Sequence, residues 1–253
     1  MTGARYPIAY QLYSSRNFSP LEAQFPELKA MGYDAIEPWL PAYEADPAAF
    51  RRALDDAGLA CFGFHMPLTG LAQDPNRYID IAKTLGASYM IPPFVPEEDR
   101  RPTADYWKGI GDMLAQGAQA AAAHDLKVLW HNHAFEYARL SDGTRPIDHI
   151  LAAPDVYFEM DCGWITRGGA DVAAELERYA DRILVIQTKD IAPLGTQEDD
   201  GWAATGDGTI DWPALAPLFR KTKAHHLCTE HDNPGDWRRF AKRSHDYLRS
   251  VGL

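Results

Sequence analysis

The chain has 253 residues, of which 46% are hydrophobic and 24% charged, and its formal net charge is −11. This length can bury a sizeable core, and this share of apolar residues excludes a disordered chain. With 25 Lys and Arg against 36 Asp and Glu, the chain lacks the basic surface that nucleic-acid binding requires, so we expect no nucleic-acid partner.

Short runs of β-branched and aromatic residues alternate with longer amphipathic segments. We predict eight strands from these runs, at residues 7–12, 35–37, 60–65, 89–92, 127–131, 156–161, 183–187 and 227–230. Capping residues followed by proline or by helix-forming residues predict helix starts between them. These starts lie at Ser19, Asp46, Asp74, Thr103, Asp211 and Asn233.

Successive strand ends lie about 26 to 43 residues apart, close to the roughly 30 residues of a βαβ unit. Eight such units in a chain of this length predict one domain over residues 1–253, folded as a (β/α)₈ TIM barrel. A doubly wound open sheet is the alternative, although no glycine-rich turn follows the first strand. The one long irregular stretch, residues 191–211, is expected to form a lid, because Trp202 gives it an apolar side chain to bury.

Several patterns bear on the location of the protein. No stretch approaches the roughly 20 apolar residues that span a bilayer, and the first seven residues contain no apolar run of signal-peptide length. Cys61, Cys162 and Cys228 lie far apart and form no Cys-x-x-Cys pair. Neither a disulfide framework nor a zinc cage is therefore indicated, and we expect a soluble, cytoplasmic protein with no membrane partner.

Polar side chains end most of the predicted strands, where a buried parallel strand would otherwise stay apolar. They are Gln11, Glu37, His65, His131, Asp161, Gln187 and Glu230. In a (β/α)₈ barrel the carboxyl ends of all the strands meet at one mouth, where active sites are built. The sequence therefore predicts that these side chains share a pocket.

Three strand ends favour a metal site. At the fifth strand, alternation places His131 and His133 on one face, with Glu136 in the loop that follows. Carboxylates and carboxamides from other strands, such as Asp161 and Glu230, suit Mg²⁺ or Mn²⁺ better than Zn²⁺. Two further acids, Asp190 and Asp232, are read equally well as ligands or as helix caps.

With these residues, the chain resembles the xylose-isomerase-like TIM-barrel superfamily of sugar isomerases and epimerases, which includes inosose-dehydratase-like enzymes. The resemblance rests on His131-Asn132-His133-Ala134-Phe135-Glu136, Asp161-Cys162-Gly163-Trp164, Thr188-Lys189-Asp190, Gly206-Asp207-Gly208-Thr209-Ile210-Asp211-Trp212 and Glu230-His231-Asp232.

The resemblance implies one divalent metal, held by Glu, Asp, His and Glu from the fifth to eighth strands. Asp161, Gln187 and Glu230 match the last three, with a glutamine where relatives have histidine. Many relatives place the first glutamate where this chain has His131, which leaves Glu136 as the expected carboxylate ligand.

The resemblance also implies proton transfer next to a carbonyl through an enediolate. The expected base is Glu136 or Glu230, and the expected acid or oxyanion partners are His131, His133 and Lys189. The expected sugar pocket contains Glu37, His65, Trp164 and Trp202. Since the chain has no basic cluster for phosphate, the expected substrate is an unphosphorylated carbohydrate. A homo-oligomer is possible, and the sequence does not decide the oligomeric state.

Three alternatives accompany the isomerase or epimerase hypothesis. The first is a lyase or dehydratase acting on a keto-sugar or keto-inositol, which the glutamine at position 187 favours. The second is a sugar-binding barrel without catalysis. The third, a DNA-repair endonuclease on the same barrel, is discounted, because the chain offers neither a histidine-rich three-zinc site nor a basic face.

Overall fold

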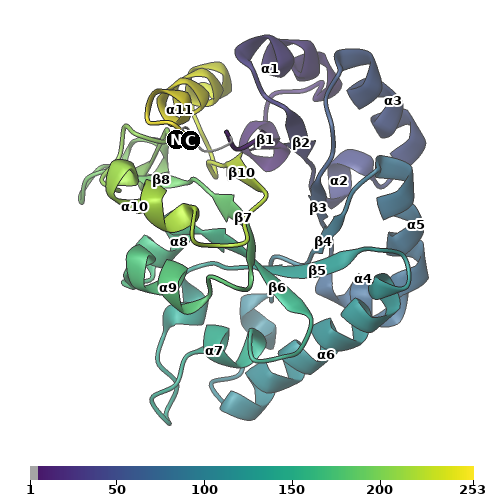
Figure 1. The fold of residues 1–253 in the computed structure, drawn as a ribbon, viewed down its shortest axis with the longest axis vertical. Helices are drawn as coiled ribbons and strands as arrows, with labels where there is room; N and C mark the ends of the chain where they lie inside the picture. The colour runs from purple at the N-terminus through teal and green to yellow at the C-terminus, as the bar shows by residue number, and fades with distance from the viewer. Residues whose placement is uncertain (1–4) are drawn as a thin grey trace.

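The computed structural model describes residues 5–253 and shows eight parallel strands arranged as a barrel with helices outside (Figure 1). The barrel strands are β1 (Ile8–Gln11), β2 (Ala35–Glu37), β3 (Gly63–His65), β4 (Tyr89–Ile91), β5 (Lys127–His131), β6 (Val156–Asp161), β7 (Ile183–Gln187) and β10 (His226–Thr229). The predicted (β/α)₈ TIM barrel is thus confirmed. Residues 1–4, part of the stretch examined for a signal peptide, lie outside the described residues.

The strands follow the order β2-β1-β10-β7-β6-β5-β4-β3, and every ladder between neighbours in this order is parallel. Between the two ends of this order, an isolated parallel bridge joins Ala35 to Ala60. The backbone N–H of Ile36 donates to Ala60 and that of Ala60 to Asp34, at 2.9 and 3.0 Å. The barrel is therefore nearly closed. The predicted strand 60–65 is shorter than expected, because Ala60 makes only this bridge.

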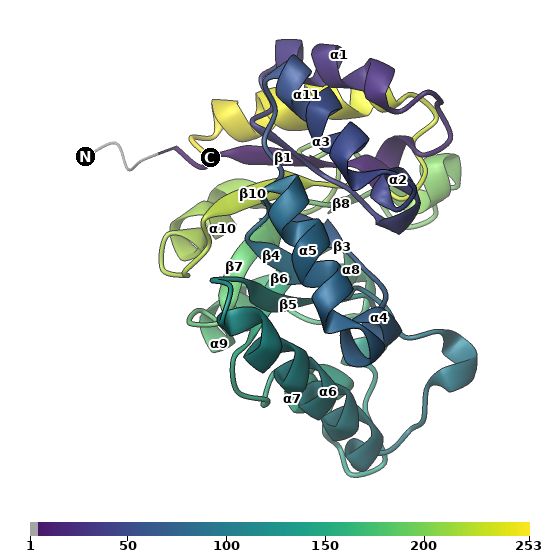
Figure 2. The same ribbon diagram turned by 90° about the vertical axis from the view of Figure 1, so that its right-hand side faces the viewer.

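Helices cover the outside of the barrel, and in the turned view α3 and α5 lie across the strands (Figure 2). The α-helices are α1 (Phe25–Met31), α2 (Leu40–Tyr43), α3 (Pro47–Ala57), α4 (Leu68–Gln73), α5 (Pro75–Leu85), α6 (Ala104–Ala122), α7 (Pro146–Ile150), α8 (Cys162–Arg167), α9 (Val172–Arg178), α10 (Trp212–Phe219) and α11 (Trp237–Ser250). The 3₁₀ turns are η1 (Leu12–Ser15), η2 (Glu22–Gln24), η3 (Glu97–Asp99), η4 (Phe135–Tyr137) and η5 (Glu198–Gly201).

Most predicted helix starts are confirmed by their caps. The side chains of Asp46, Asp74, Thr103 and Asp211 each accept a hydrogen bond from a backbone N–H in the first turn of the helix that follows. Two were wrong. The expected start at Ser19 lies before a 3₁₀ turn, and α1 begins at Phe25. The expected start at Asn233 gives way to Asp236, whose carboxylate accepts from the N–H groups of residues 238 and 239 and so begins α11.

Alternation along each strand separates two environments. Outward-facing residues such as Phe158 and Met160 join the large apolar cluster that includes helix residues. Inward-facing residues, among them Ala9, Leu129 and Cys228, form a much smaller cluster inside the barrel. This small apolar cluster fills only part of the interior, and the inward positions nearer the carboxyl ends carry polar side chains.

The stretch 191–211 was expected to be irregular, but part of it forms a hairpin. Short strands β8 (Asp190–Ile191) and β9 (Trp202–Ala203) pair antiparallel and enclose η5. The Asp190 carboxylate accepts hydrogen bonds from three backbone N–H groups of residues 206–210 and from the Trp212 indole. Gly208 permits this approach, since a Cβ there would lie 2.2 Å from Asp190 Oδ1. Asp190 therefore shapes the loop.

Within residues 5–253, we find no helix whose length and apolar content would let it cross a membrane.

Candidate active site

Three side chains that can bind a cation meet at the carboxyl end of the barrel. Ligand atoms of His131, Asp161 and Glu230 all lie within 4.8 Å of one another. The first two residues end β5 and β6, and the third follows β10 directly. All three are buried. The convergence of distant strand ends on one site, expected from the sequence, thus holds for this set.

Each of these residues, and Gln187 beside them, has a buried polar atom without a hydrogen-bond partner among the described residues. The atoms are His131 Nδ1, Asp161 Oδ2, Gln187 Oε1 and Glu230 Oε2. We call these four residues the unpaired group. They come from β5, β6, β7 and the end of β10, which are consecutive in the barrel. An unpaired buried polar atom costs about 1–3 kcal/mol, so four together indicate a site for a bound cation.

The remaining atoms of the group hold it in place. Asp161 Oδ1 accepts the backbone N–H of Trp164 at 2.7 Å and so begins α8. Asn132 bridges β5 to β6, since its carboxamide bonds both the N–H and the carbonyl of Asp161. Asp161 Oδ2 thus faces away from the helix that Oδ1 caps.

Burial lowers the pKa of His131 and of His133 well below the ordinary value, and nearby cations lower it further. Both imidazoles are therefore neutral, which is the form that can bind a metal or donate one hydrogen bond. The His133 ring lies 5.0 Å from the rings of His131 and Trp164, and its Nδ1 has no hydrogen-bond partner within residues 5–253.

Lys189 is a fully buried cation at the edge of the unpaired group. Its ammonium pairs with Asp232 and lies 3.8 Å from Glu230 Oε1. Burial lowers the pKa of Lys189, but the carboxylates of Glu230 and Asp232 raise it more, and the net direction is upward. Lys189 is therefore charged. Asp232, left open between cap and ligand, is its ion-pair partner.

A second polar cluster lies against the first and consists of Gln11, Glu37, His65 and Glu159, which we call the paired group. His65 Nε2 lies 3.3 Å from Glu159 Oε2 and 3.4 Å from Glu37 Oε1. Gln11 Nε2 donates to Glu37 Oε1 at 2.9 Å. In contrast to the unpaired group, these side chains largely satisfy one another.

Charge in the paired group is balanced by protons. Burial lowers the pKa of His65, but Glu159 and Glu37 raise it to a net value of about 10. Burial and the charge of Glu37 raise the pKa of Glu159 well above its ordinary value. An imidazolium and a carboxyl pair that shares a proton give a nearly neutral cluster, as a low-dielectric interior demands.

Glu136 lies apart from both groups. Its two oxygens accept the indole N–H of Trp130, at 3.0 Å, and the backbone N–H of His133, at 2.8 Å. Trp130 belongs to the outer apolar cluster, so Glu136 sits on the helix-facing side of β5. The structure therefore does not bring Glu136 to the expected metal ligands, and His131 stands at the fifth-strand position instead.

Trp164 and Trp202 form one wall of the site, with ring centroids 4.6 Å apart. The Lys189 ammonium lies 4.7 and 4.5 Å from the two ring centroids. Arg167 covers Trp202 at 3.4 Å, and Trp202 is only 3% exposed. Of the two rings expected to stack on a sugar, Trp164 is thus the more accessible.

The loop of the β8–β9 hairpin is held in place by hydrogen bonds to residues that follow β10. Asp199 and Asp200 both have left-handed φ, +51° and +57°, which is strained for a residue other than glycine. Asp199 Oδ1 accepts the Gly235 N–H at 2.9 Å, and the Asn233 carboxamide donates to Asp200 at 3.3 Å. These contacts hold the predicted lid against the loop that follows β10.

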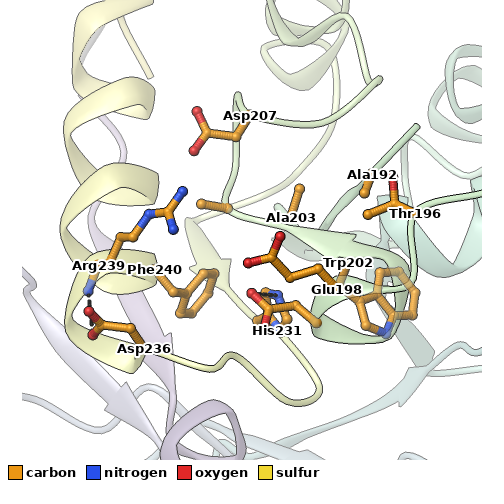
Figure 3. Close-up of a pocket in the computed structure, with 12 residues that line it drawn as sticks. Ala192, Thr196, Glu198, Trp202, Ala203, Asp207, His231, Asp236, Arg239 and Phe240 are labelled. Atoms are coloured by element: carbon orange, nitrogen blue, oxygen red, sulfur yellow. Dashed lines mark hydrogen bonds and ion pairs between the residues drawn. The ribbon is translucent and has the colours of Figure 1, made fainter.

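A cavity of about 200 Å³ lies between this hairpin and α11 (Figure 3). Glu198 and Trp202 lie on the hairpin side and Arg239 on the α11 side, with His231 between them. Four of its twelve lining residues are acidic, and none of the unpaired group lines it.

Sequence reasoning missed Glu159, and it placed Gln11 in the shared pocket without assigning it a role. The side chains predicted to share the pocket were strand ends, and Glu159 is not one. Glu159 lies two positions before Asp161, so the two share a face of β6. The two-residue alternation already present in the sequence was the signal that could have identified it.

Comparisons with known proteins agree with this fold. A family model described as xylose isomerase-like TIM barrel matches residues 25–251. An inosose dehydratase of Geobacillus kaustophilus is 28% identical over 163 residues, which cover 57% of this chain and 51% of that protein. The chain therefore matches about half the length of this curated relative.

Two solved structures show the same fold. A sugar phosphate isomerase/epimerase from Parabacteroides distasonis has a TM-score of 0.83 at 18% identity, over 98% of this chain and 94% of that one. A xylose isomerase-like TIM barrel protein from Mycobacterium smegmatis, solved in complex with magnesium, has a TM-score of 0.74 at 16% identity, over 98% and 96%.

Proposed function

Because the chain belongs to the xylose isomerase-like TIM-barrel family, we propose that it is a divalent-metal-dependent isomerase or epimerase acting on a small, unphosphorylated carbohydrate. Enzymes of this superfamily include isomerases, epimerases and dehydratases that act on small-molecule sugars. The observation that carries the proposal is the unpaired group, with four unpartnered buried atoms on consecutive strands.

His131, Asp161, Gln187 and Glu230 would hold the metal. Three of these residues offer oxygen and one offers nitrogen, a set that suits Mn²⁺ or Mg²⁺ better than Zn²⁺. A bound divalent cation polarises a carbonyl and stabilises the charge that develops on its oxygen. Glu136 is not part of this proposed set, because its oxygens are bound on the other side of β5.

The protein's own side chains would orient the substrate and move the proton. We assign Glu230 as the base, since its carboxylate lies at the barrel mouth, 3.8 Å from the Lys189 ammonium. Lys189, charged and next to Glu230, would donate to the substrate oxygen where negative charge develops. His133, a neutral imidazole beside Trp164, would be a second donor.

A dehydratase is the second candidate, and two observations favour it. The curated relative reported above is an inosose dehydratase. In addition, Gln187 replaces the histidine expected in metal-dependent isomerases of this type. Both candidates begin with removal of a proton next to a carbonyl, and a dehydratase then expels a neighbouring hydroxyl.

Proton exchange and product mass separate these candidates. The Mn²⁺-loaded protein is incubated in D₂O with a series of unphosphorylated keto-sugars and a keto-inositol. An isomerase or epimerase incorporates deuterium next to the carbonyl and gives a product isomeric with the substrate. A dehydratase gives a product lighter by one water. If no compound exchanges a proton while Mn²⁺ is bound, the proposal fails in favour of a sugar-binding barrel.

A further inference from the structure

The carboxamide of Gln187 lies between two acidic side chains. Its nitrogen, Nε2, is 2.5 Å from Glu159 Oε1 and 3.3 Å from Glu37 Oε1. All three side chains are buried. The two carboxyl groups share one proton, so at least one of the two oxygens can only accept, whereas only one end of a carboxamide can donate. The NH₂ end of Gln187 must therefore face the acids, because the reverse orientation would press unpaired oxygens together.

This orientation decides where the other end of the carboxamide points. With the nitrogen held by the paired group, Gln187 Oε1 is turned away from it and has no partner among residues 5–253. Gln187 is in register with Asp161 on the neighbouring strand. The free oxygen is thus left on the side of the unpaired group.

We infer that Glu159 is a positioning residue, which fixes Gln187 with its oxygen toward the divalent-cation site. The inference rests on the proposed function, since it assigns a role relative to that cation. Glu159 makes the shorter contact to Gln187 and is in turn held by His65. The paired group therefore acts as an outer layer of the metal site, the layer that orients metal ligands in proteins.

The consequence is a neutral oxygen donor where related sites use an imidazole. A carboxamide oxygen is a hard ligand, and it adds no charge to a site that already contains Asp161 and Glu230. A free glutamine could present either end to the cation, and an NH₂ group cannot bind one. Glu159 removes this ambiguity.

The inference is tested by titrating the metal-stripped protein with Mn²⁺ in a calorimeter. In Glu159→Gln, the new carboxamide can donate as well as accept, so the orientation of Gln187 is no longer dictated. We expect the Mn²⁺ dissociation constant to rise about 10- to 100-fold, the usual effect of losing an outer-layer partner. Glu159→Asp, which keeps the carboxylate, should lose less and serves if the first variant fails to fold.

A double-mutant cycle separates positioning from simple loss of negative charge. If Glu159 acts through Gln187, then adding Glu159→Gln to Gln187→Ala changes the dissociation constant less than about twofold. Glu175→Gln is the matched control. Glu175 belongs to α9, is also buried, and pairs with Arg145 at 2.7 Å. It should bind Mn²⁺ as the wild type does.

The outcomes are distinct. A loss that is equal with and without Gln187 would show a charge effect and overturn the inference, as would wild-type affinity in Glu159→Gln. In both cases the proposed metal-dependent function would survive. A wild-type protein that binds no Mn²⁺ would instead remove the proposed function, and the inference with it.

Discussion

The unpaired and paired groups are built from similar residues but behave differently. The paired group contains two carboxylates with an imidazole 3.3 to 3.4 Å from both, and protons balance its charge. The unpaired group contains two carboxyl groups whose pKa is raised by burial and an imidazole whose pKa is lowered, so its histidine supplies no balancing charge. Two positions along β6, from Glu159 to Asp161, separate one situation from the other.

This contrast shows how burial can prepare a site. Polar atoms that satisfy one another gain little from a ligand, whereas unsatisfied ones gain from any cation that reaches them. The first group would therefore stabilise the barrel, and the second would be stabilised only on binding. Substitutions in the two groups should differ in sign as well as in size.

The largest expected effect comes from Glu230→Gln, which removes a ligand and the proposed base together. We expect kcat/KM to fall on the order of 10³-fold and the Mn²⁺ dissociation constant to rise on the order of 10²-fold. Steady-state kinetics and calorimetry measure both. Wild-type turnover in this variant would show that the unpaired group is not the active site.

The next prediction compares signs in the metal-free protein. His65→Leu leaves two buried carboxylates without their cation and should lower the free energy of unfolding by about 3 kcal/mol. Asp161→Asn keeps the helix cap but removes a buried carboxyl group whose charged form burial disfavours, and should raise the free energy of unfolding by about 1 kcal/mol. Urea denaturation of both variants without metal is the measurement. If both variants change the free energy of unfolding in the same direction, the proposed difference between the two groups is wrong.

The pH dependence of stability sharpens the comparison further. The pKa of His65 is about 10 in the folded protein, against an ordinary value of 6.5. Between these values the folded state retains a proton that the unfolded state has released. The stabilisation is therefore fully present below pH 6.5 and lost as the pH rises through 10. In His65→Leu this part of the pH profile should be absent.

The smallest effect concerns the wall above the unpaired group. Trp202→Phe keeps an aromatic ring near Trp164 but weakens the contact with Arg167, worth about 0.5–1 kcal/mol. Substrate KM should rise about two- to fivefold with kcat unchanged. A large fall in kcat would mean that Trp202 belongs to the reacting site itself.

Much of the barrel could be predicted because its determinants are local. Apolar runs defined β5, β6 and β7 at their observed bounds, and aspartates before helices defined several helix starts. The hairpin of β8 and β9 escaped prediction because its strands are two residues long. It depends instead on contacts that Asp190 makes with distant backbone.

The site was only partly predictable for a related reason. A position at a strand end shows that a side chain reaches the mouth, as it did for Asp161. It does not show which hydrogen bonds the side chain already makes. Glu136 was expected as a ligand because His131 stands where relatives have a glutamate, but a 3₁₀ turn carries Glu136 to the outer side of β5.

The isolated bridge at Ala60 gives the paired group a mechanical role as well. Glu37 and His65 end the two strands on either side of this seam, which is joined by the Ala60 bridge and by a hydrogen bond from the His65 N–H to the Pro38 carbonyl. The contact between these two side chains links β2 to β3 where few backbone hydrogen bonds do so. Amide hydrogen exchange near residues 60–65 should therefore accelerate when His65 loses its proton. The barrel would then open locally between β2 and β3 before it opens elsewhere.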